Sequence, residues 1–544
     1  MPADLVFRHG AIYTVDAARS WAAAVAVRQG RIVYVGSDDL PPGLIGPQTE
    51  VVDLAGRMLL PGFQDGHVHP VESGIDLGLC NLTDAESVAA ASAAIRAWAA
   101  AHPDARWVRG GGWQLPLFPD GNPSKTLLDQ LVPDRPALLW AADGHSAWAN
   151  SRALALAGVT RDTPDPPSGR IERDARGEPS GTLRESAADL VYRKVPPVTD
   201  AEYAAGLARA DSLASSFGIT TMFSARTDEG QLRALAAADR AGTLTTRVIA
   251  ALEVPGAGGD TLLARLRDWR TRYATRHVLP TAAKLFQDGV IESGTAALLA
   301  PYLGRRVGAG TPIRDQVTLD RLTAALDREG FQIHVHAIGD RAIRMTLDAL
   351  ARARAVNGPR DARPAIAHLE LIDPADIPRF RALGVVANFQ PLWADGDEYL
   401  TRMTEPYLGP ARSRWLYPIA SVVRTGAVVT GGSDWSVSSL DPLEAIEVGI
   451  THRDPGDTVS AVWHPIERVD LPTMIALYTI NAAWAHHLEH ETGSIEVGKL
   501  ADLIVLDRNL FDLPPERIHE ARVVRTLFEG RTVFERAASQ PPSP

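Results

Sequence analysis

The chain has 544 residues, of which 45% are hydrophobic and 22% charged, so it can bury a large core and is not disordered throughout. Its 55 basic and 66 acidic residues leave a net charge of −11, which argues against non-specific nucleic-acid binding because that needs a basic face. No run approaches the ~18 apolar residues of a membrane helix. Cys80 is the only cysteine and the start lacks the pattern of a secretion signal. We therefore expect a cytoplasmic protein that acts on a small molecule and has no nucleic-acid or membrane partner.

The two ends of the chain have the same character. Residues 1–57 contain short β-branched runs separated by turns, and so do residues 486–536. Neither piece is large enough to bury its own core, so we expect both termini to pair into one small β-sandwich. Residues 537–544 are expected to form a disordered tail.

Between the two ends, the sequence repeats a helix, a Gly-containing turn and a short β-branched run. Strands that alternate with helices pair in parallel through right-handed crossovers, and eight such strands close a β/α barrel. We therefore predict an α/β fold in which residues 58–70 and 201–485 form a (β/α)8 TIM-like barrel. The predicted barrel strands are 59–69, 218–225, 246–254, 282–289, 330–338, 363–371, 384–391 and 426–434.

One span interrupts this repeat after the first predicted barrel strand. Residues 71–200 are too many for a loop within a compact domain, so they are expected to form an inserted subdomain. Within it, residues 169–185 read as a hairpin. Because the insertion follows a strand, we expect it to lie over the C-terminal mouth of the barrel. Trp113 and Trp148 are candidates to line an apolar pocket there; the alternative is that both belong to the core.

Polar residues fall at the predicted strand ends, where a barrel places its active site. His67 and His69 lie two residues apart on the first strand, so both point to one face. A single His in a strand is more often a core residue, but this set occupies five different strands in matching positions. Imidazole, carboxylate and amine groups that converge are suitable ligands for a divalent metal such as Zn²⁺. The set consists of His67, His69, Lys284, His334, His336, His368 and Asp434.

The sequence resembles the amidohydrolase superfamily, and within it the amidohydrolase-3 (YtcJ-like) branch that includes N-substituted formamide deformylases. The resemblance runs nearly the whole length of the chain. It implies a metal-dependent barrel beside a β-sandwich made from both termini, and a homo-oligomer such as a dimer. The motifs that carry it are LLPGFQDGHVHP, DGHSAWANSRAL, KLFQDGVIESGTAALLAPY, HVHAIGDRAI, AIAHLEL, GGSDWSV and TGSIEVGKLADLIVLD.

The resemblance also implies roles for single residues. Lys284 would be a carboxylated lysine that bridges two metal ions, and Asp434 would transfer protons. Only four of the 55 basic residues are Lys, so the chain uses Arg for nearly every positive charge. This independently favours a role for Lys284 that needs an amine, since a carbamate does not form on a guanidinium. The alternative is an ordinary buried Lys284 paired with Asp288, and whether one or two metal ions bind depends on this point. The implied metal ligands are His67, His69, Lys284, His336, His368 and Asp434.

The remaining histidines considered are not among the implied metal ligands. We interpret His334 as a residue that orients a ligand or fills the lower barrel. His145, within the insertion, matches the family and is a candidate to donate a hydrogen bond to the substrate carbonyl or its anion; the alternative is a structural role. We expect the cluster that resembles a second metal site to be only a solvated helical face. That cluster is His486, His487 and His490.

The implied reaction is hydrolysis of a C–N bond in an amide, N-formyl or N-acyl amine. Metal-bound hydroxide would attack the carbonyl carbon, Asp434 would carry the proton to the leaving nitrogen, and the metal with His145 would stabilise the oxyanion.

Three alternatives to this reaction stay open. The same scaffold supports cleavage of carbamates, esters or cyclic amides and deamination. A non-catalytic binding protein would have lost ligands, and none of the six is missing. A metal-independent enzyme would stay active after chelation.

Overall fold

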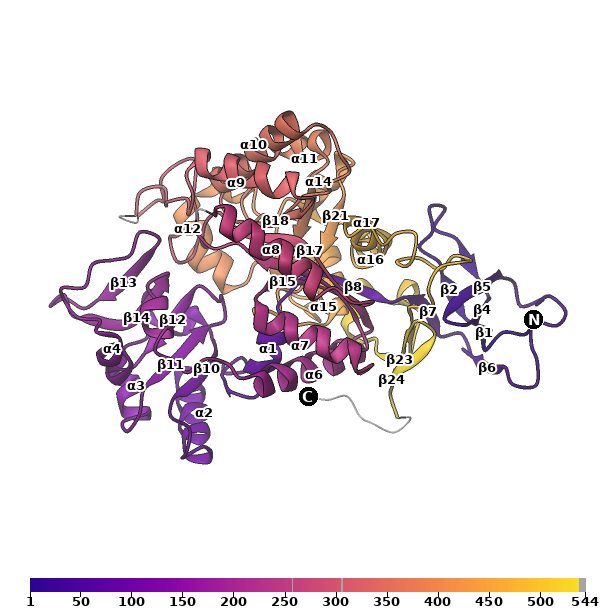
Figure 1. Cartoon of the computed structure of the whole chain (residues 1–544), viewed down its shortest axis with the longest axis horizontal. Coiled ribbons are helices and arrows are strands. Elements are labelled where there is room, and N and C mark those ends of the chain that lie inside the picture. The colour runs from indigo at the N-terminus through magenta and orange to yellow at the C-terminus, as the bar shows by residue number, and fades with distance from the viewer. Residues whose placement is uncertain (257, 305–306, 538–544) are drawn as a thin grey trace.

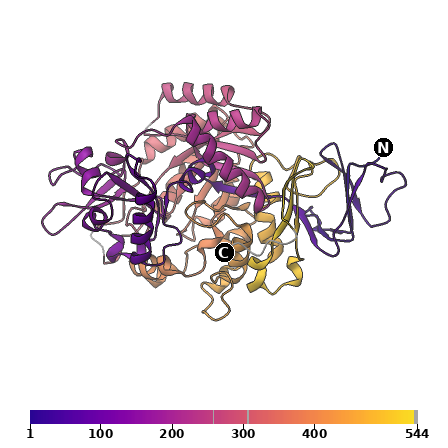
Figure 2. The ribbon, with the colours of Figure 1, turned by 90° about the horizontal axis from the view of Figure 1, so that it is seen from below.

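The computed structural model describes residues 1–256, 258–304 and 307–537, so the tail expected at 537–544 lies outside the described residues from position 538 onward. Three parts follow one another along the long axis of the molecule (Figure 1). A β-sandwich occupies one end, a barrel the middle, and a mixed sheet with its helices the other end. The view from below shows the same order (Figure 2). The predicted fold class is therefore confirmed.

The barrel contains eight strands in one sheet, and each pairs in parallel with its neighbours in chain order. All eight predicted strand regions contribute to it. Alternate residues of each strand face the interior of the barrel. The inward residues of the second, third and fourth strands form a small apolar cluster, and Lys284 and His334 point to the same interior. The strands are β8 (Phe63–Val68), β15 (Ile219–Thr227), β16 (Arg247–Glu253), β17 (Val278–Phe286), β18 (Gln332–Ala337), β19 (Ala365–His368), β20 (Val386–Phe389) and β21 (Val429–Gly431).

The barrel is closed by the segment that follows β21. The backbone N–H of Asp434 donates to the carbonyl of His67 at 2.7 Å, and the N–H of His69 donates to the carbonyl of Trp435 at 3.1 Å. These two bonds join the end of the eighth strand to the end of the first. They also bring residues that lie more than three hundred positions apart in the sequence side by side.

Amphipathic helices cover the outside of the barrel (Figure 1). Several begin with an Asp or Thr whose side chain accepts a hydrogen bond from a free backbone N–H of the first turn, and Thr199 and Glu202 form a complete capping box. Among the described residues, no helix combines the length and apolar character needed to cross a membrane. The main covering helices are α6 (Asp200–Ser216), α7 (Glu229–Arg240), α8 (Asp260–Arg272), α9 (Gln316–Arg328), α10 (Asp340–Asn357), α11 (Ile377–Leu383), α14 (Ile419–Arg424) and α15 (Pro442–Thr451).

The sandwich consists of two sheets that share one apolar core drawn from both ends of the chain. One sheet has the order β5 (Arg31–Gly36), β4 (Ala24–Arg28), β1 (Leu5–Arg8) and β6 (Glu50–Asp53). The other has the order β24 (Arg531–Glu535), β23 (Val523–Phe528), β22 (Leu503–Leu506), β7 (Met58–Pro61), β2 (Ala11–Tyr13) and β3 (Trp21–Ala22). Since β22 pairs with β7, the C-terminal strands complete the sheet that the N-terminal strands begin.

The run predicted as one strand at 59–69 is divided between the sandwich and the barrel. Leu60 and Pro61 of β7 pair with β22, whereas Phe63 of β8 pairs with Ile219 of β15. The division falls at Gly62, whose N–H donates to the carbonyl of Asp502 at 2.8 Å. A continuous apolar run cannot reveal this change of partner, because both halves are buried.

The inserted subdomain contains a six-stranded mixed sheet in which β9 to β11 are parallel and the other pairs antiparallel. The predicted hairpin at 169–185 is confirmed as β13 and β14. Leu115 of the insertion donates its N–H to the hydroxyl of Tyr399, which lies beyond β20, so the insertion reaches the C-terminal side of the barrel. Its elements are β9 (Cys80–Asn81), α2 (Val88–Ala101), β10 (Val108–Trp113), α3 (Lys125–Leu131), β11 (Ala137–Ala141), β12 (Ser146–Ala149), α4 (Ser151–Ala157), β13 (Gly169–Arg173), β14 (Pro179–Glu185) and α5 (Asp189–Tyr192).

The helix that follows His69 packs very closely against α6. Helix α1 (Pro70–Asp76) starts at the next residue, and a β-carbon added at Gly206 of α6 would lie 2.5 Å from Ile75 Cγ1 and 2.8 Å from the carbonyl oxygen of Val71. The contact therefore needs a residue without a side chain at position 206. It fixes the position of α1, and with it the end of the strand that carries His67 and His69.

We expect Gly206→Val to lower the free energy of unfolding by about 1–3 kcal/mol, because the added side chain forces the two helices apart. The matched control is Ala205→Val, which places the same side chain on the exposed side of the same helix. Thermal unfolding followed by circular dichroism measures both. Equal melting temperatures for the two variants would show that the close contact is unimportant.

Candidate metal centre

Six predicted ligands lie at the C-terminal end of the barrel. His67 is in β8 and His69 directly follows it, and Lys284 lies near the end of β17. His336 is the penultimate residue of β18, His368 ends β19, and Asp434 follows β21. His368 and Asp434 have left-handed backbone conformations, with φ of 81° and 52°. Such strained positions concentrate at functional sites, and here they turn both side chains at the barrel mouth.

Three of these residues form a compact group of potential ligand atoms. His67, His368 and Asp434 are buried, and each offers one atom within 4.8 Å of the other two. His69 adds a fourth group, because its Nε2 lies 3.0 Å from Asp434 Oδ1, while His67 Nε2 lies 3.4 Å from the same oxygen. The Asp434 carboxylate is therefore the centre on which three imidazoles converge.

The electrostatics of this group fit a metal ion. Burial, reinforced by the nearby Lys284 charge, holds the pKa of His67 and His368 well below the usual histidine value, so both imidazoles are neutral and keep a lone pair for a metal. Although imidazole nitrogens of His67 and His69 lie near it, Asp434 Oδ1 is buried and takes part in no hydrogen bond with the described residues, and the same holds for His69 Nδ1. A buried carboxylate oxygen without a donor is costly unless a cation faces it. The residues thus fit a divalent metal bound at Asp434.

His334 lies directly behind His67. Its Nε2 is 2.8 Å from His67 Nδ1, so that contact occupies Nδ1 and leaves Nε2 of His67 to face Asp434. Gln390, which follows β20, holds His368 in a similar way through its Oε1, 2.9 Å from His368 Nδ1. Such partners fix the orientation of ligating imidazoles. His334 thus contacts a predicted ligand, and its role in orienting that ligand stays a prediction. Sequence reasoning missed Gln390, although a polar residue at the end of a barrel strand could have indicated it.

Lys284 is almost fully buried, and its Nζ lies 3.3 Å from His67 Nε2. Burial lowers the pKa of its amine to about 7. Among the described residues, no ion pair joins Lys284 to Asp288. The Asp288 carboxylate instead accepts hydrogen bonds from the backbone N–H groups of Ala297, Ile338 and Gly339. The geometry therefore does not favour the alternative of an ordinary Lys284–Asp288 pair.

His336 is adjacent to this group and turned partly away from it. Its ring lies 4.4 Å from the ring of His368, but its Nε2 is 3.3 Å from the carbonyl oxygen of Gly289. Burial also keeps the pKa of His336 well below its usual value. Its neutral imidazole is thus close enough to serve a second metal position, and its part as a ligand stays a prediction.

The amidohydrolase-3 model of the amidohydrolase family matches residues 50–534. The chain belongs to this family. Among relatives, it is 31% identical to Protein LONG AFTER FAR-RED 3 of Arabidopsis thaliana over 98% of this chain and 92% of that protein. It is 29% identical to the putative amidohydrolase YtcJ of Bacillus subtilis and 28% identical to the N-substituted formamide deformylase of Arthrobacter pascens, each over 98% of this chain and 99% of the relative.

A solved structure agrees in fold. An uncharacterized metal-dependent hydrolase from Pyrococcus horikoshii matches with a TM-score of 0.75 and 22% identity, over 94% of this chain and 99% of that one. The resemblance to the amidohydrolase-3 branch inferred from the motifs is thereby confirmed, and the solved structure shares the fold.

In this amidohydrolase, His145 reaches the barrel mouth from the insertion. Its ring lies 5.0 Å from the ring of His336. Burial alone would lower the pKa of His145, but the carboxylates of Glu185 and Asp143 outweigh burial and raise it to about 9. His145 is therefore a cation at neutral pH and a hydrogen-bond donor. Glu185, its closest partner, carried no signal in the sequence because acidic residues at hairpin ends are common.

The two tryptophans have a different place from the one predicted. Trp113 and Trp148 are fully buried in the core of the insertion, and their indole N–H groups donate to the backbone carbonyls of Leu139 and Ser124. Phe118 packs edge-on against both rings. A pocket-lining role is therefore not supported, and the core alternative accounts for them because these hydrogen bonds satisfy the polar end of each ring.

His486 also departs from the prediction. His487 and His490 are exposed as expected, but both ring nitrogens of His486 are buried, and its ring stacks on Phe223 at 4.7 Å. Burial lowers the pKa of His486 to about 3, so it is a neutral packing residue beneath the barrel. The solvated-face interpretation is wrong for His486 because the helix that precedes it packs against the barrel.

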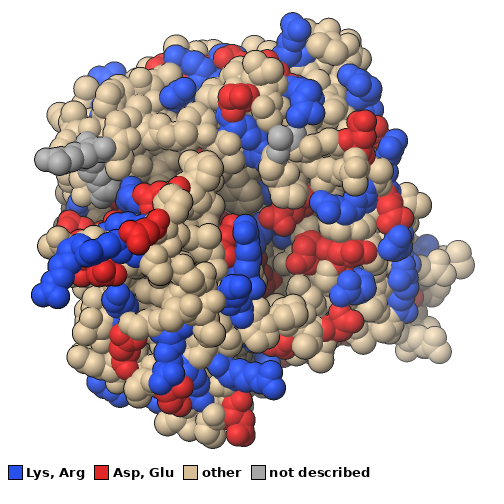
Figure 3. All heavy atoms as spheres, turned by 60° about the vertical axis from the view of Figure 1, so that its left-hand side comes forward, with Lys and Arg blue, Asp and Glu red and all other residues tan. Residues whose placement is uncertain are grey.

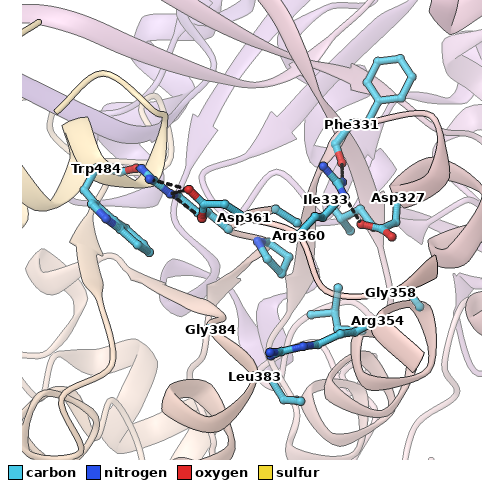
Figure 4. Close-up of a pocket in the computed structure, with 15 residues that line it drawn as sticks. Asp327, Phe331, Ile333, Arg354, Gly358, Arg360, Asp361, Leu383, Gly384 and Trp484 are labelled. Atoms are coloured by element: carbon cyan, nitrogen blue, oxygen red, sulfur yellow. Dashed lines mark hydrogen bonds and ion pairs between the residues drawn. The ribbon is translucent and has the colours of Figure 1, made fainter. Parts of the chain in front are cut away.

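Two hollows are visible on the molecule. The face that carries the insertion is hollowed near its middle, with acidic and basic side chains around it (Figure 3). A separate cavity of about 270 Å³ is lined by residues that precede β18 and β19, including Phe331, Pro364 and Arg354 (Figure 4). That cavity lies at the N-terminal ends of the strands, opposite the metal centre. It is therefore not part of the active site.

We expect His67→Ala to reduce the bound metal to less than about a tenth of the wild-type content, because it removes a neutral imidazole from the centre of the ligand group. The control is His486→Ala, which removes a buried histidine of the same barrel that does not contact Asp434. Elemental mass spectrometry on protein purified without chelators gives the metal content per chain. Equal metal contents in the two variants would exclude His67 as a ligand.

Proposed function

We propose that this amidohydrolase cleaves the C–N bond of an N-substituted amide, such as an N-formyl or N-acyl amine, and releases a carboxylic acid and an amine. The proposal rests on one observation above all. The buried Asp434 carboxylate has an oxygen without a hydrogen-bond donor, and three imidazoles converge on it at the barrel mouth.

Zn²⁺ suits this donor set of nitrogen and oxygen atoms, and His67, His69, His368 and Asp434 would hold it. When bound, the ion would supply a Lewis acid and lower the pKa of water from 15.7 to about 7. The ring contacts of His334 with His67 and of Gln390 with His368 would keep the ligand nitrogens pointed at it.

Asp434 would move the proton. It would accept one from the attacking water and return it to the nitrogen of the leaving amine, so that the C–N bond breaks as a neutral amine forms. His145, held above His336, would donate a hydrogen bond to the carbonyl oxygen as negative charge develops there. Both groups lie on the side of the barrel that the insertion covers.

The substrate class has support from similarity. One relative that matches over nearly the full length of both chains is named as a deformylase of N-substituted formamides. That name concerns the Arthrobacter protein, and we propose the same class of bond for this chain. The chromogenic compound 4-nitroformanilide is a direct probe, because its hydrolysis yields formate and the yellow 4-nitroaniline.

We expect Asp434→Asn to reduce kcat on 4-nitroformanilide by about 10³-fold or more while the fold and part of the metal remain, because the amide cannot accept the proton. Circular dichroism and metal content serve as controls in the same preparation. An Asn variant with wild-type turnover would remove Asp434 from proton transfer.

Lys284 would carry a carbamate in this proposal. Its uncharged amine would attack carbon dioxide, form an N–C bond and release one proton, leaving a carboxylate between two metal positions. The lowered pKa of Lys284 supports this, because burial favours the uncharged amine that can attack carbon dioxide.

We expect Lys284→Arg to lower metal content from two ions per chain to one or fewer, because a guanidinium does not form a carbamate and repels a second cation. Lys499→Arg is the matched control, since Lys499 lies in the sandwich region and pairs with Glu496. Intact-protein mass spectrometry under native conditions detects the carbamate, and elemental analysis gives the metal content per chain. Two metal ions in the Arg variant would contradict the carbamate.

A further inference from the structure

His145 is held in place at several points, and most of them lead to Glu185. The backbone N–H of His145 donates to the Asp143 carboxylate at 2.8 Å, and its carbonyl accepts from the N–H of Glu185 at 2.9 Å. The His145 ring then turns back to the same residue, with Nδ1 2.9 Å from Glu185 Oε2. This arrangement follows from the antiparallel register, because Ser146 at the start of β12 pairs with Arg184 near the end of β14. His145, just before Ser146, therefore lies opposite Glu185, just after Arg184.

The second oxygen of Glu185 contacts the barrel. Glu185 Oε1 accepts a hydrogen bond at 2.7 Å from the hydroxyl of Thr295, which lies in the loop between β17 and α9. The Thr295 hydroxyl also accepts from the N–H of Val290 at 2.9 Å, so the tight turn from Gly289 to Thr295 fixes its position. One carboxylate thus joins the insertion to a loop at the barrel mouth.

This carboxylate lies against the residue that contacts His336. A β-carbon added at Gly289 would lie 2.2 Å from Glu185 Oε1, so only glycine permits the approach. The carbonyl of the same Gly289 is 3.3 Å from His336 Nε2. Glu185 also has a left-handed backbone, with φ of 50°, which indicates that surrounding contacts hold it there at some cost.

We propose that Glu185 is a positioning residue for catalysis, which fixes the His145 ring over the metal centre by bridging it to Thr295. The inference rests on the proposed function of His145 as a donor to the substrate carbonyl. With Nδ1 bound to Glu185, Nε2 is the ring nitrogen left for substrate. Because catalytic donors lose most of their effect when misplaced by about 1 Å, the bridge sets the rate rather than the affinity for substrate.

A double-mutant cycle tests this inference with 4-nitroformanilide. We expect Glu185→Gln to lower kcat about 30-fold and to change KM by less than about 3-fold, since the charge is lost and the shape kept. In a His145→Ala background, Glu185→Gln should change kcat by less than about 2-fold, because its effect acts through the ring. Glu178→Gln, an exposed carboxylate on the same hairpin paired with Arg161, is the matched control. Fully multiplicative losses in the double variant would overturn the inference.

Thr295 provides a second, independent pair of variants. Thr295→Val removes the hydroxyl that fixes Glu185 and should lower kcat about 10-fold, and Thr295→Ser should restore most of that loss because it keeps the hydroxyl. Metal content should stay equal to wild type in every variant of Glu185 and Thr295. Loss of metal from Glu185→Gln would overturn the inference, because the residue would then act through the ligands.

A measurement without substrate separates the two proposals. Hydrogen exchange, followed by mass spectrometry on the metal-loaded enzyme, should be faster in Glu185→Gln and Thr295→Val for the peptides around His145 and around the turn at 289–295. Unchanged exchange in both peptides would contradict the bridge. If the wild-type enzyme does not hydrolyse 4-nitroformanilide, the proposed substrate class fails, while the exchange result still decides whether Glu185 holds His145.

Discussion

Two backbone hydrogen bonds at the seam of the barrel determine where its chemistry can occur. They run from Asp434 N–H to the carbonyl of His67 and from His69 N–H to the carbonyl of Trp435. Closing a β/α barrel requires its last strand to meet its first. In this chain the residues at that meeting point are themselves the candidate ligands. The contacts that complete the fold thus place a carboxylate against two imidazoles, and no separate element is needed to bring them together.

The same seam explains how strongly polar groups are tolerated in a dry interior. Asp65 lies on β8 inside the barrel and accepts hydrogen bonds from the N–H groups of His67 and Ser433, which come from the two joined strands. Burial raises the pKa of Asp65 to about 7, so the carboxyl is partly protonated near neutrality. The cost of burying the Asp65 carboxyl is offset by these hydrogen bonds, which join the two strands. Asp434 has no such donors on Oδ1, and this difference between two nearby carboxyl groups distinguishes a structural acid from one that fits a metal ion.

Much of this arrangement could be predicted because the β/α repeat imposes strict rules. Alternating strands and helices fixed eight parallel strands, and polar residues at their carboxyl ends had to converge on one mouth. The prediction could not reach features that depend on side-chain packing between distant segments. Trp113 and Trp148 are of a residue type that often lines pockets, yet both lie in the core of the insertion, where they donate hydrogen bonds to the carbonyls of Leu139 and Ser124. The burial of His486 depends on a neighbour, Phe223, that is far away in the sequence.

The insertion couples to the barrel through side chains that such rules do not govern. A barrel alone leaves its mouth open to water, and substrate choice then depends on what covers it. The carboxylate of Glu185 makes one of the polar contacts between the cover and the barrel, because it accepts from Thr295 while it also contacts His145 within the insertion. A carboxylate that bridges two parts of a protein transmits any displacement of one part to the other. Because His145 is carried by the insertion and His336 by the barrel, in the proposed mechanism the relative position of these parts would determine whether the donor and the metal ligand face the same substrate atom. In the proposed mechanism the insertion would therefore position a catalytic group as well as cover the barrel mouth.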